Sequence, residues 1–183
     1  MRDRLRRCFA RGVGLILIGV VSDTHIPSRA RELPKPLLQA FAGVDMIIHA
    51  GDITAPTVLE ELGQLAPVVA VAGNMDSWEM YERLGEIRLL ELAGFRIGVL
   101  HGHGGYGNVR DRVLAAFTDV DCIVFGHTHA PYCQKHEGVL LFNPGSPTDR
   151  RRQPRASYGL LHLGREIRGE IIFLGGGEIT AHE

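Results

Sequence analysis

Short runs of apolar, mostly β-branched residues recur along the chain, and helix-like segments separate several of them. Such near-continuous apolar runs are typical of strands that are buried on both faces of a sheet. They cover residues 15–21, 46–48, 68–71, 97–100, 122–125 and 139–142. The alternation of strands with helices predicts an α/β fold with a largely parallel sheet and helices packed on it.

Three of the intervening segments have apolar residues at helical spacing and a residue that favours the start of a helix. Proline, which suits the first turn of a helix, opens the segments 34–42 and 56–65. Asn108, a preferred N-cap residue, opens the segment 108–117. We therefore expect a helix in each of these three segments.

Two pairs of apolar runs are joined by turn residues, which indicates hairpins. Gly164-Arg165 joins the runs 156–163 and 166–174, and Ala93-Gly94 lies in the middle of the segment 87–100. We expect antiparallel pairing in both places, in addition to the parallel strands.

The length and composition of the chain fit one globular domain. Its 183 residues are 45% hydrophobic and 22% charged, and no apolar run is long enough to span a membrane. Arginines before the first strand imitate the start of a secretion signal, but Ser22-Asp23 follows, with no cleavage site of small residues. We expect residues 1–14 to form a poorly ordered extension and residues 15–183 to form a single domain.

Cysteine content and net charge exclude several classes of function. The three cysteines form no CxxC pair, which argues against a disulfide framework and against a thiolate zinc site. This pattern fits a reducing compartment, and we expect a cytoplasmic protein. The net charge of −1 gives no electrostatic reason for non-specific binding of nucleic acid.

Polar side chains that can bind metals follow almost every predicted strand. The first three strands run into Asp23-Thr24-His25, Gly51-Asp52 and Gly73-Asn74. Two later strands run into His101-Gly102-His103 and Gly126-His127-Thr128-His129. Because sites in α/β sheets form just beyond the carboxyl ends of the strands, we expect these groups at one edge of the sheet.

The number and type of these side chains indicate a centre of two metal ions. Carboxylate, amide and imidazole ligands suit borderline divalent ions such as manganese, iron, cobalt, nickel or zinc. Seven candidate ligands exceed what one tetrahedral zinc ion needs, and two ions that share a carboxylate fit the number better. The candidates are Asp23, His25, Asp52, Asn74, His101, His127 and His129.

These motifs, in this order, resemble those of the calcineurin-like metallophosphoesterase family. Asp-x-His, Gly-Asp, Gly-Asn-x-Asp, His-Gly-His and Gly-His-Thr-His are weak signals singly and a strong one together. The small branch of YfcE-like single-domain phosphodiesterases is the nearest match, from about Leu15 to near the C-terminus, and it includes Asn143-Pro144-Gly145-Ser146. The resemblance implies a two-sheet β-sandwich flanked by helices, in four α/β/β/α layers.

The resemblance also implies a role for each ligand. One divalent ion would be held by Asp23, His25, Asp52 and His129. The other would be held by Asp52, Asn74, His101 and His127, so that Asp52 bridges the two ions. Asp52 and Asn74 thereby also belong to the catalytic group, and manganese is the expected metal, with nickel, iron, cobalt and zinc as alternatives.

The implied activity is hydrolysis of phosphodiesters, or of small phosphomonoesters, by attack of a hydroxide that bridges the two ions. His103 follows a ligand by two residues and is a third catalytic candidate, for binding the phosphate or donating a proton. Many larger family members carry histidine after the asparagine of the Gly-Asn motif, where this chain has Met75. Methionine cannot donate a proton, so we expect the rate to depend steeply on the pKa of the leaving group.

Two other functions are compatible with the same fold. A scaffold that binds partner proteins would not need the ligands, all of which are present here. A nuclease would use the same centre and a basic groove, which the composition does not indicate. The expected partner is a small phosphate ester rather than a membrane or nucleic acid, and association into a homo-oligomer is left open.

Several other residues have more than one interpretation. His49 is expected to be a buried, hydrogen-bonded histidine rather than a ligand. Asp76 either holds the backbone near a ligand or is an ordinary loop carboxylate. The arginines within 150–155 either attract anionic substrates or lie on a solvated loop. Trp78 and Met80 are candidates for the core, a substrate wall or a subunit contact.

Overall fold

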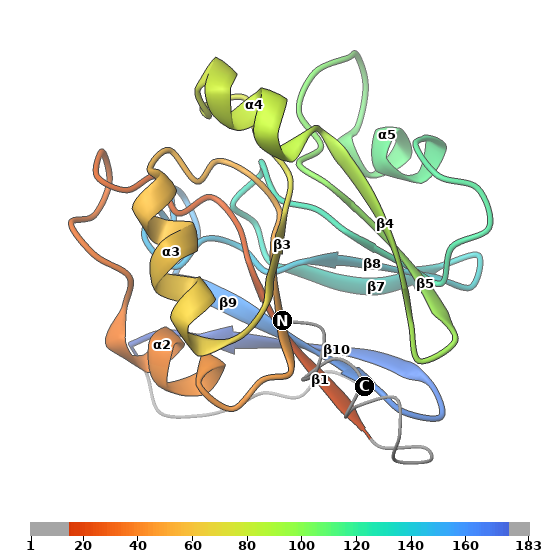
Figure 1. Ribbon diagram of the computed structural model, residues 1–183. Coiled ribbons are helices and arrows are strands. Elements are labelled where there is room, and N and C mark those ends of the chain that lie inside the picture. The colour runs from red at the N-terminus through yellow and green to blue at the C-terminus, as the bar shows by residue number, and fades with distance from the viewer. Residues whose placement is uncertain (1–14, 176–183) are drawn as a thin grey trace.

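Two five-stranded sheets face each other in the computed structural model, which describes residues 15–175 (Figure 1). The extension predicted over residues 1–14 and the last eight residues of the predicted domain lie outside the described residues. The two-sheet arrangement that the family resemblance implied is confirmed.

The first sheet has the strand order β10-β9-β1-β2-β3. Its strands are β1 (Ile16–Val21), β2 (Met46–His49), β3 (Val68–Ala70), β9 (Ser157–Leu163) and β10 (Ile167–Phe173). Parallel pairing joins β1 to β2 and β2 to β3, whereas β9 pairs antiparallel with both β1 and β10.

The second sheet has the strand order β4-β5-β6-β8-β7. Its strands are β4 (Ile87–Leu92), β5 (Phe95–Leu100), β6 (Cys122–Val124), β7 (Tyr132–His136) and β8 (Val139–Asn143). Here β5, β6 and β8 are parallel, and β4 and β7 are antiparallel edge strands. Both predicted hairpins are confirmed, but antiparallel pairs are as numerous as parallel ones, so the largely parallel sheet was only half right.

Four helices of the described residues 15–175 lie outside the sheets, and three of them were predicted. They are α2 (Lys35–Phe41), α3 (Pro56–Leu65), α4 (Trp78–Leu84) and α5 (Val109–Ala115). The start of α5 is capped by Asn108, whose side chain accepts the N–H of Arg110 at 3.0 Å. None of these helices, which belong to residues 15–175, is long and apolar enough to cross a bilayer.

Three apolar clusters join these elements into four layers. Ile18, Val99 and Phe142 belong to the cluster between the two sheets. Phe41 of α2 and Leu62 of α3 pack on the outer face of the first sheet, and α5 packs on that of the second. Rigid layers on both sides hold the parallel strands in register, so their carboxyl ends stay fixed relative to one another.

Candidate metal centre

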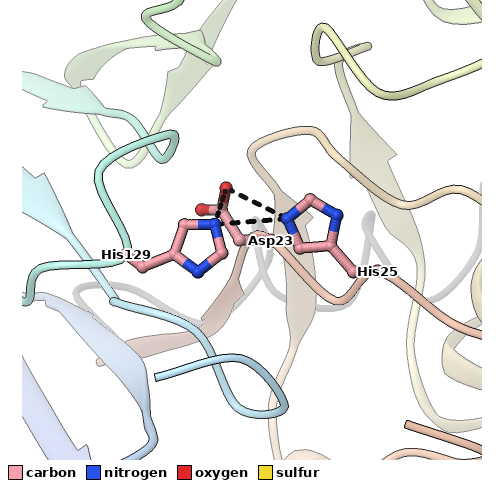
Figure 2. A group of neighbouring side chains, drawn as sticks. All are labelled: Asp23, His25 and His129. Carbon is pink, nitrogen blue, oxygen red and sulfur yellow. Dashed lines mark hydrogen bonds and ion pairs between the residues drawn. The ribbon is translucent and has the colours of Figure 1, made fainter. Parts of the chain in front are cut away.

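Five of the seven predicted ligands meet where strands of both sheets end. Asp23 and His25 follow β1, Asp52 follows β2, His101 follows β5 and His129 comes after β6, and all five are buried. Their ligand atoms form two groups that share Asp23. One group adds His25 and His129, and the other adds Asp52 and His101. Within each group the ligand atoms lie within 4.8 Å of one another. Figure 2 shows the first group.

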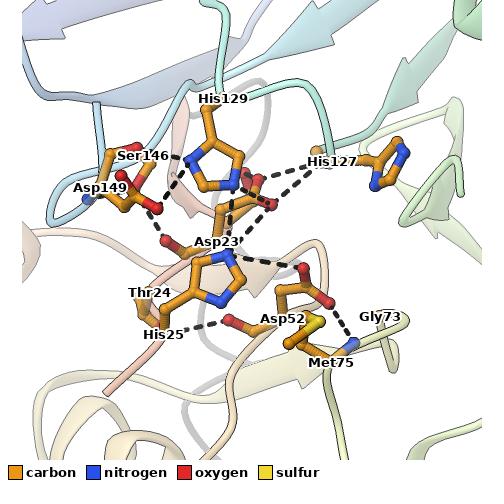
Figure 3. Close-up of polar contacts among 12 residues, drawn as sticks. Asp23, Thr24, His25, Asp52, Gly73, Met75, His127, His129, Ser146 and Asp149 are labelled. Carbon is orange, nitrogen blue, oxygen red and sulfur yellow. Dashed lines mark hydrogen bonds and ion pairs between the residues drawn. The ribbon is translucent and has the colours of Figure 1, made fainter. Parts of the chain in front are cut away.

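Short contacts lie within each group and also connect the two groups. Asp52 Oδ2 lies 3.5 Å from His25 Nε2 and 3.3 Å from His101 Nε2, so one carboxylate oxygen reaches an imidazole of each group. His129 Nε2 lies 3.2 Å from both Asp23 Oδ1 and His25 Nε2 (Figure 3). Such an arrangement suits two neighbouring cations that share a carboxylate.

Outward hydrogen bonds fix which nitrogen of two histidines faces the centre. His101 Nδ1 donates to the carbonyl of Ala50 at 2.7 Å, and His129 Nδ1 donates to the carbonyl of Asp149 at 2.5 Å. A carbonyl only accepts, so Nδ1 carries the hydrogen and Nε2 faces the carboxylates. His101 Nε2 is buried and has no hydrogen-bond partner among residues 15–175. A proton or a metal ion must separate Nε2 from the nearby carboxylate oxygen, and the donor set fits a divalent ion.

Both carboxylates are ionised although they are buried. Burial opposes the ionisation of Asp52, but His101 and the backbone N–H of Met75 outweigh it and lower the pKa of Asp52 to about 2. Burial also opposes the ionisation of Asp23, whose pKa is nevertheless lowered by His129 and His101. Two negative charges in one buried region are costly unless cations balance them, which is a second reason why divalent ions fit.

Five predicted ligands have a left-handed backbone, which non-glycine residues rarely adopt. Their φ angles are 55° for Asp23, 44° for His25, 55° for Asp52, 68° for His127 and 55° for His129. Each such residue costs about 1–3 kcal/mol, so the contacts around it must hold it in place. Backbone strain of this kind gathers at functional sites, and here it marks one edge of the sandwich.

Two glycines let the chain approach the carboxylates closely. A Cβ at Gly126 would lie 2.7 Å from Asp23 Oδ2, and a Cβ at Gly73 would collide with Asp52 Oδ1. The N–H of His127 donates to Asp23 Oδ2 at 3.0 Å, and that of Met75 donates to Asp52 Oδ1 at 2.8 Å. The absence of side chains at both glycines therefore allows backbone donors to hold the two carboxylates.

Asp76 holds the backbone, which was one of its two predicted roles. Its carboxylate accepts four N–H groups, those of Asp52 at 3.0 Å, Ile53 at 2.8 Å, Thr54 at 2.7 Å and Gly73 at 2.7 Å. Burial, with the nearby charge of Asp52, raises the pKa of Asp76 in spite of these hydrogen bonds. Asp76 thereby ties the loop that carries Asp52 to the loop after β3.

Three other predicted site residues lie at this edge without sharing the short contacts. The His127 ring is partly buried, 5.2 Å from the His101 ring in an edge-to-face arrangement. The His103 ring is 5.4 Å from that of His101, and its Nε2 lies 2.7 Å from the Tyr81 hydroxyl. Asn74 is exposed, and its side chain makes no hydrogen bond within residues 15–175. The structure thus brings His127 and His103 beside the cluster and leaves Asn74 at the surface.

His49 is fully buried at the end of β2, and only one of its nitrogens is satisfied. Its Nε2 lies 3.1 Å from the Thr24 hydroxyl, whereas its Nδ1 is buried and has no partner in the described part of the chain. Burial lowers the pKa of His49 to about 3. The ring is therefore neutral in the folded protein at any pH above about 4.

Replacing His49 with glutamine should make folding stability less sensitive to acid. The unfolded histidine has a pKa near 6.5 and the folded one about 3, so the unfolded state takes up a proton first as the pH falls. The contribution of neutral His49 to the free energy of unfolding is therefore fully present above pH 6.5. It falls as the pH is lowered toward 3, by up to about 1.4 kcal/mol per pH unit. Urea unfolding from neutral pH to about pH 4 measures the slope, with the exposed residue in His136→Gln as control. Equal slopes for His49→Gln and the wild type would contradict this.

Sequence patterns missed three residues that hold the site in place. Ser146 donates to the carbonyl of Asp23 at 2.7 Å, and it belongs to the Asn143-Pro144-Gly145-Ser146 motif that could have indicated it. Asp149 and Tyr81 gave no local signal, because 20 and 22 residues separate them from the histidines that they contact.

Comparison with known proteins shows the family of this chain. A family model described as the calcineurin-like phosphoesterase superfamily domain matches residues 16–166. This chain belongs to that superfamily. This calcineurin-like phosphoesterase is 43% identical to a probable metallophosphoesterase of Methanothermobacter thermautotrophicus. The match extends over 162 residues and covers 87% of this chain and 94% of the relative. Membership supports hydrolysis of phosphate esters.

Solved structures with this calcineurin-like phosphoesterase fold have different names. Vps29 of Entamoeba histolytica in complex with zinc is 26% identical, with a TM-score of 0.73 over 90% of this chain and 96% of that one. An archaeal phosphodiesterase is 23% identical, with a TM-score of 0.64 over 86% of this chain and 100% of that one. The fold hosts both, so function must be argued from the site.

Proposed function

We propose that this protein is a metal-dependent phosphodiesterase that also accepts small phosphomonoesters. The observation that carries the proposal is the buried pair of ionised carboxylates, Asp23 and Asp52, faced by the Nε2 atoms of three histidines. This combination of charge, ligand type and burial suits divalent ions, and the family relationship supports phosphate esters as substrates.

The proposed ligands divide into two sets. Asp23, His25, Asp52 and His129 would hold one ion, and Asp52, Asn74, His101 and His127 would hold the other. The contacts of Asp52 Oδ2 with both His25 and His101 support Asp52 as the shared ligand, and the exposed Asn74 has the least support. Such ions supply Lewis acidity toward phosphoryl oxygens and a lower pKa for bound water. Manganese is the proposed native metal.

The proposed role of His103 is to donate a hydrogen bond to the substrate phosphate. Burial, with the nearby charge of His101, lowers the pKa of His103, so the ring is neutral at pH 7. The Tyr81 hydroxyl can donate to Nε2, which leaves the hydrogen on Nδ1. Nδ1 is buried and has no partner among residues 15–175, so the ring must turn before this hydrogen can reach a phosphate oxygen. A neutral donor can bind a phosphate oxygen without transferring a proton.

His103→Ala should lower kcat about a hundredfold, since it removes a donor to developing negative charge. Tyr81→Phe should lower kcat about tenfold. The His103 ring remains, but without the Tyr81 hydroxyl its hydrogen is no longer held on Nδ1. Steady-state kinetics across pH would measure both effects, with Tyr106→Phe as the control because Tyr106 is fully exposed. An unchanged rate and pH profile for His103→Ala would exclude this role.

The rate should fall as the leaving group becomes more basic, by up to about tenfold per unit of its pKa. Met75, 58% exposed beside Asn74, stands where larger family members carry a proton-donating histidine. A series of aryl phosphodiesters with graded phenol pKa values would measure the slope. A flat series would show that another group protonates the leaving oxygen.

Metal titration tests the proposed function directly. The protein would be stripped of metal with a chelator and then titrated with Mn²⁺ while it hydrolyses bis(p-nitrophenyl) phosphate. We expect activity to rise with added ion and to saturate near two ions per chain. A protein that neither takes up divalent ions nor gains activity from them would overturn the proposal.

A scaffold for partner proteins is the second candidate. The fold is shared with Vps29 of Entamoeba histolytica, and Vps29 stands for vacuolar protein sorting 29. A scaffold would bind a partner protein equally well after its carboxylates were replaced. The complete set of seven ligand-type residues favours catalysis, since the buried charges of Asp23 and Asp52 and the left-handed backbone of five of the seven are costly without a function.

A further inference from the structure

Two arginines from distant parts of the chain share one carboxylate at the rim of the metal centre. Arg29 lies in the loop after β1 and Arg151 in the loop after β8. Their Nε atoms lie 3.4 Å and 4.0 Å from the same atom, Asp149 Oδ2. The two guanidinium groups therefore face one point, although 122 positions separate them in the sequence.

That point adjoins the candidate metal centre. The carbonyl of Asp149 accepts His129 Nδ1 at 2.5 Å, and Asp149 Oδ2 lies 3.8 Å from the same nitrogen. Figure 3 shows Asp149 on the side of His129 that faces away from Asp52. The arginine pair thus flanks the part of the centre formed by His25 and His129.

Buried hydrogen bonds fix the loop that carries Asp149 and Arg151. Ser146, itself 1% exposed, donates to the carbonyl of Asp23 at 2.7 Å and accepts the N–H of Asp149 at 2.8 Å. Thr148 donates to the carbonyl of Thr24 at 2.6 Å. The position of Arg151 is therefore tied to the strand end that carries the first two ligands.

Both guanidinium groups keep free donors that can reach an anion. Both arginine side chains contact Asp149 through Nε, and no hydrogen bond among residues 15–175 uses their terminal NH groups. Their side chains are 63% and 51% exposed. Two positive charges share one negative charge here, and exposed Arg150 and Arg152 add two more on the same loop. A guanidinium whose Nε faces a carboxylate still presents two parallel donors, its terminal NH groups, and these match a phosphate.

We infer that Arg29 and Arg151 form a second anion subsite, so that the substrate is a phosphodiester with a further phosphate group on the His129 side. This inference rests on the proposed function, because the scissile diester would occupy the metal centre. The substrate class would then carry two phosphates. Of the two roles considered for the arginines within 150–155, Arg151 would have the one that attracts anions.

Equilibrium binding tests the subsite without requiring turnover. Isothermal titration calorimetry would compare thymidine 3′,5′-bisphosphate with thymidine 5′-phosphate, with and without Mn²⁺. We expect the wild type to bind the bisphosphate roughly tenfold more tightly, and the preference to shrink with added salt. Arg29→Gln/Arg151→Gln should lose it, and Arg29→Lys/Arg151→Lys should keep part of it.

Arg168→Gln is the matched control. Its Nε also lies 3.5 Å from a carboxylate, that of Glu166, and the side chain is 75% exposed. Arg168 pairs with His162, which pairs with Leu17 near the start of β1, the end of the strand remote from Asp23. Arg168→Gln should keep the wild-type preference. Equal binding of both ligands by the wild type, or an equal loss in Arg168→Gln, would overturn the subsite.

Turnover separates the subsite from the proposed function. The p-nitrophenyl ester of thymidine 5′-phosphate would be compared with the same ester that carries a 3′-phosphate. We expect the 3′-phosphate to lower KM about tenfold with a similar kcat in the wild type, and not in the double glutamine variant. Equal KM values would reject the subsite and leave the phosphodiesterase intact. Hydrolysis of neither ester would reject the phosphodiesterase, and the binding comparison would still decide on the subsite.

Discussion

Asp52→Asn should lower the turnover of a phosphodiester at least about a thousandfold, which corresponds to about 4 kcal/mol of barrier. The amide has nearly the shape of the carboxylate, and its oxygen can still accept the N–H of Met75 that Oδ1 accepts at 2.8 Å. What it lacks is the negative charge that Oδ2 places between His25 and His101. The effect therefore isolates charge from packing.

Metal binding gives this substitution a readout that does not depend on turnover. Ligands that bind the folded state raise its melting temperature, so Mn²⁺ should raise Tm in the wild type and much less in Asp52→Asn. Glu166→Gln, the same chemical change at a side chain that is 60% exposed, serves as the control. Wild-type activity and an unchanged response to Mn²⁺ would show that Asp52 is no ligand.

Asp76→Asn should weaken Mn²⁺ binding and turnover about 10–100-fold, the usual effect of losing a group that orients a metal ligand. The carboxylate of Asp76 accepts four backbone N–H groups, and an amide oxygen can accept only two of them. Two N–H groups would then face the amide nitrogen, so unfolding free energy should also fall by about 2–3 kcal/mol.

A matched carboxylate separates the two effects of Asp76→Asn. Asp121 accepts one backbone N–H, that of Arg96 at 2.7 Å, just before β6 begins. Asp121→Asn should leave Mn²⁺ binding unchanged, because it lies at the opposite end of β6 from His127. Calorimetric titration with Mn²⁺ and urea unfolding would measure both variants. If Asp76→Asn lost stability but bound Mn²⁺ like the wild type, Asp76 would be a structural residue only.

The sequence predicted that most of the candidate ligand side chains lie at one edge of the sheets because local pattern and topology agree there. A buried parallel strand is recognisable from a few consecutive residues, and its carboxyl end has a fixed place in the sheet. Asp23, His25 and Asp52 could therefore be placed at one edge of the sheet from the strand ends alone. Asn74 follows its strand equally well, yet it is exposed, because the direction of a loop side chain depends on contacts that no local pattern encodes.

Two elements escaped prediction for physical reasons. Helix α4 is short, and of its residues only Met80 is buried while Trp78 is 74% exposed, so it has no apolar stripe. Strand β7 is an edge strand with exposed polar residues, and it is defined only by its pairing with β8. Of the roles left open from sequence, Met80 therefore belongs to the core, and Trp78 lies at the surface.

Long-range pairings explain the rest of what the sequence did not predict. Asp76 contacts backbone groups more than 20 positions away, and Arg29 meets Asp149 across 120 positions. Each pairing exists only after the sheets have formed. Such residues look like ordinary loop charges in a single sequence.

The proposed ligands come from the two halves of the sandwich in nearly equal number. Those that follow β1, β2 and β3 belong to the first sheet, and those that follow β5 and β6 belong to the second. Each bound ion would thus act as a cross-link between the sheets, in addition to the apolar layer that separates them. Chelation would then loosen the join between the two sheets as well as stop hydrolysis, and neither sheet alone would carry a working centre.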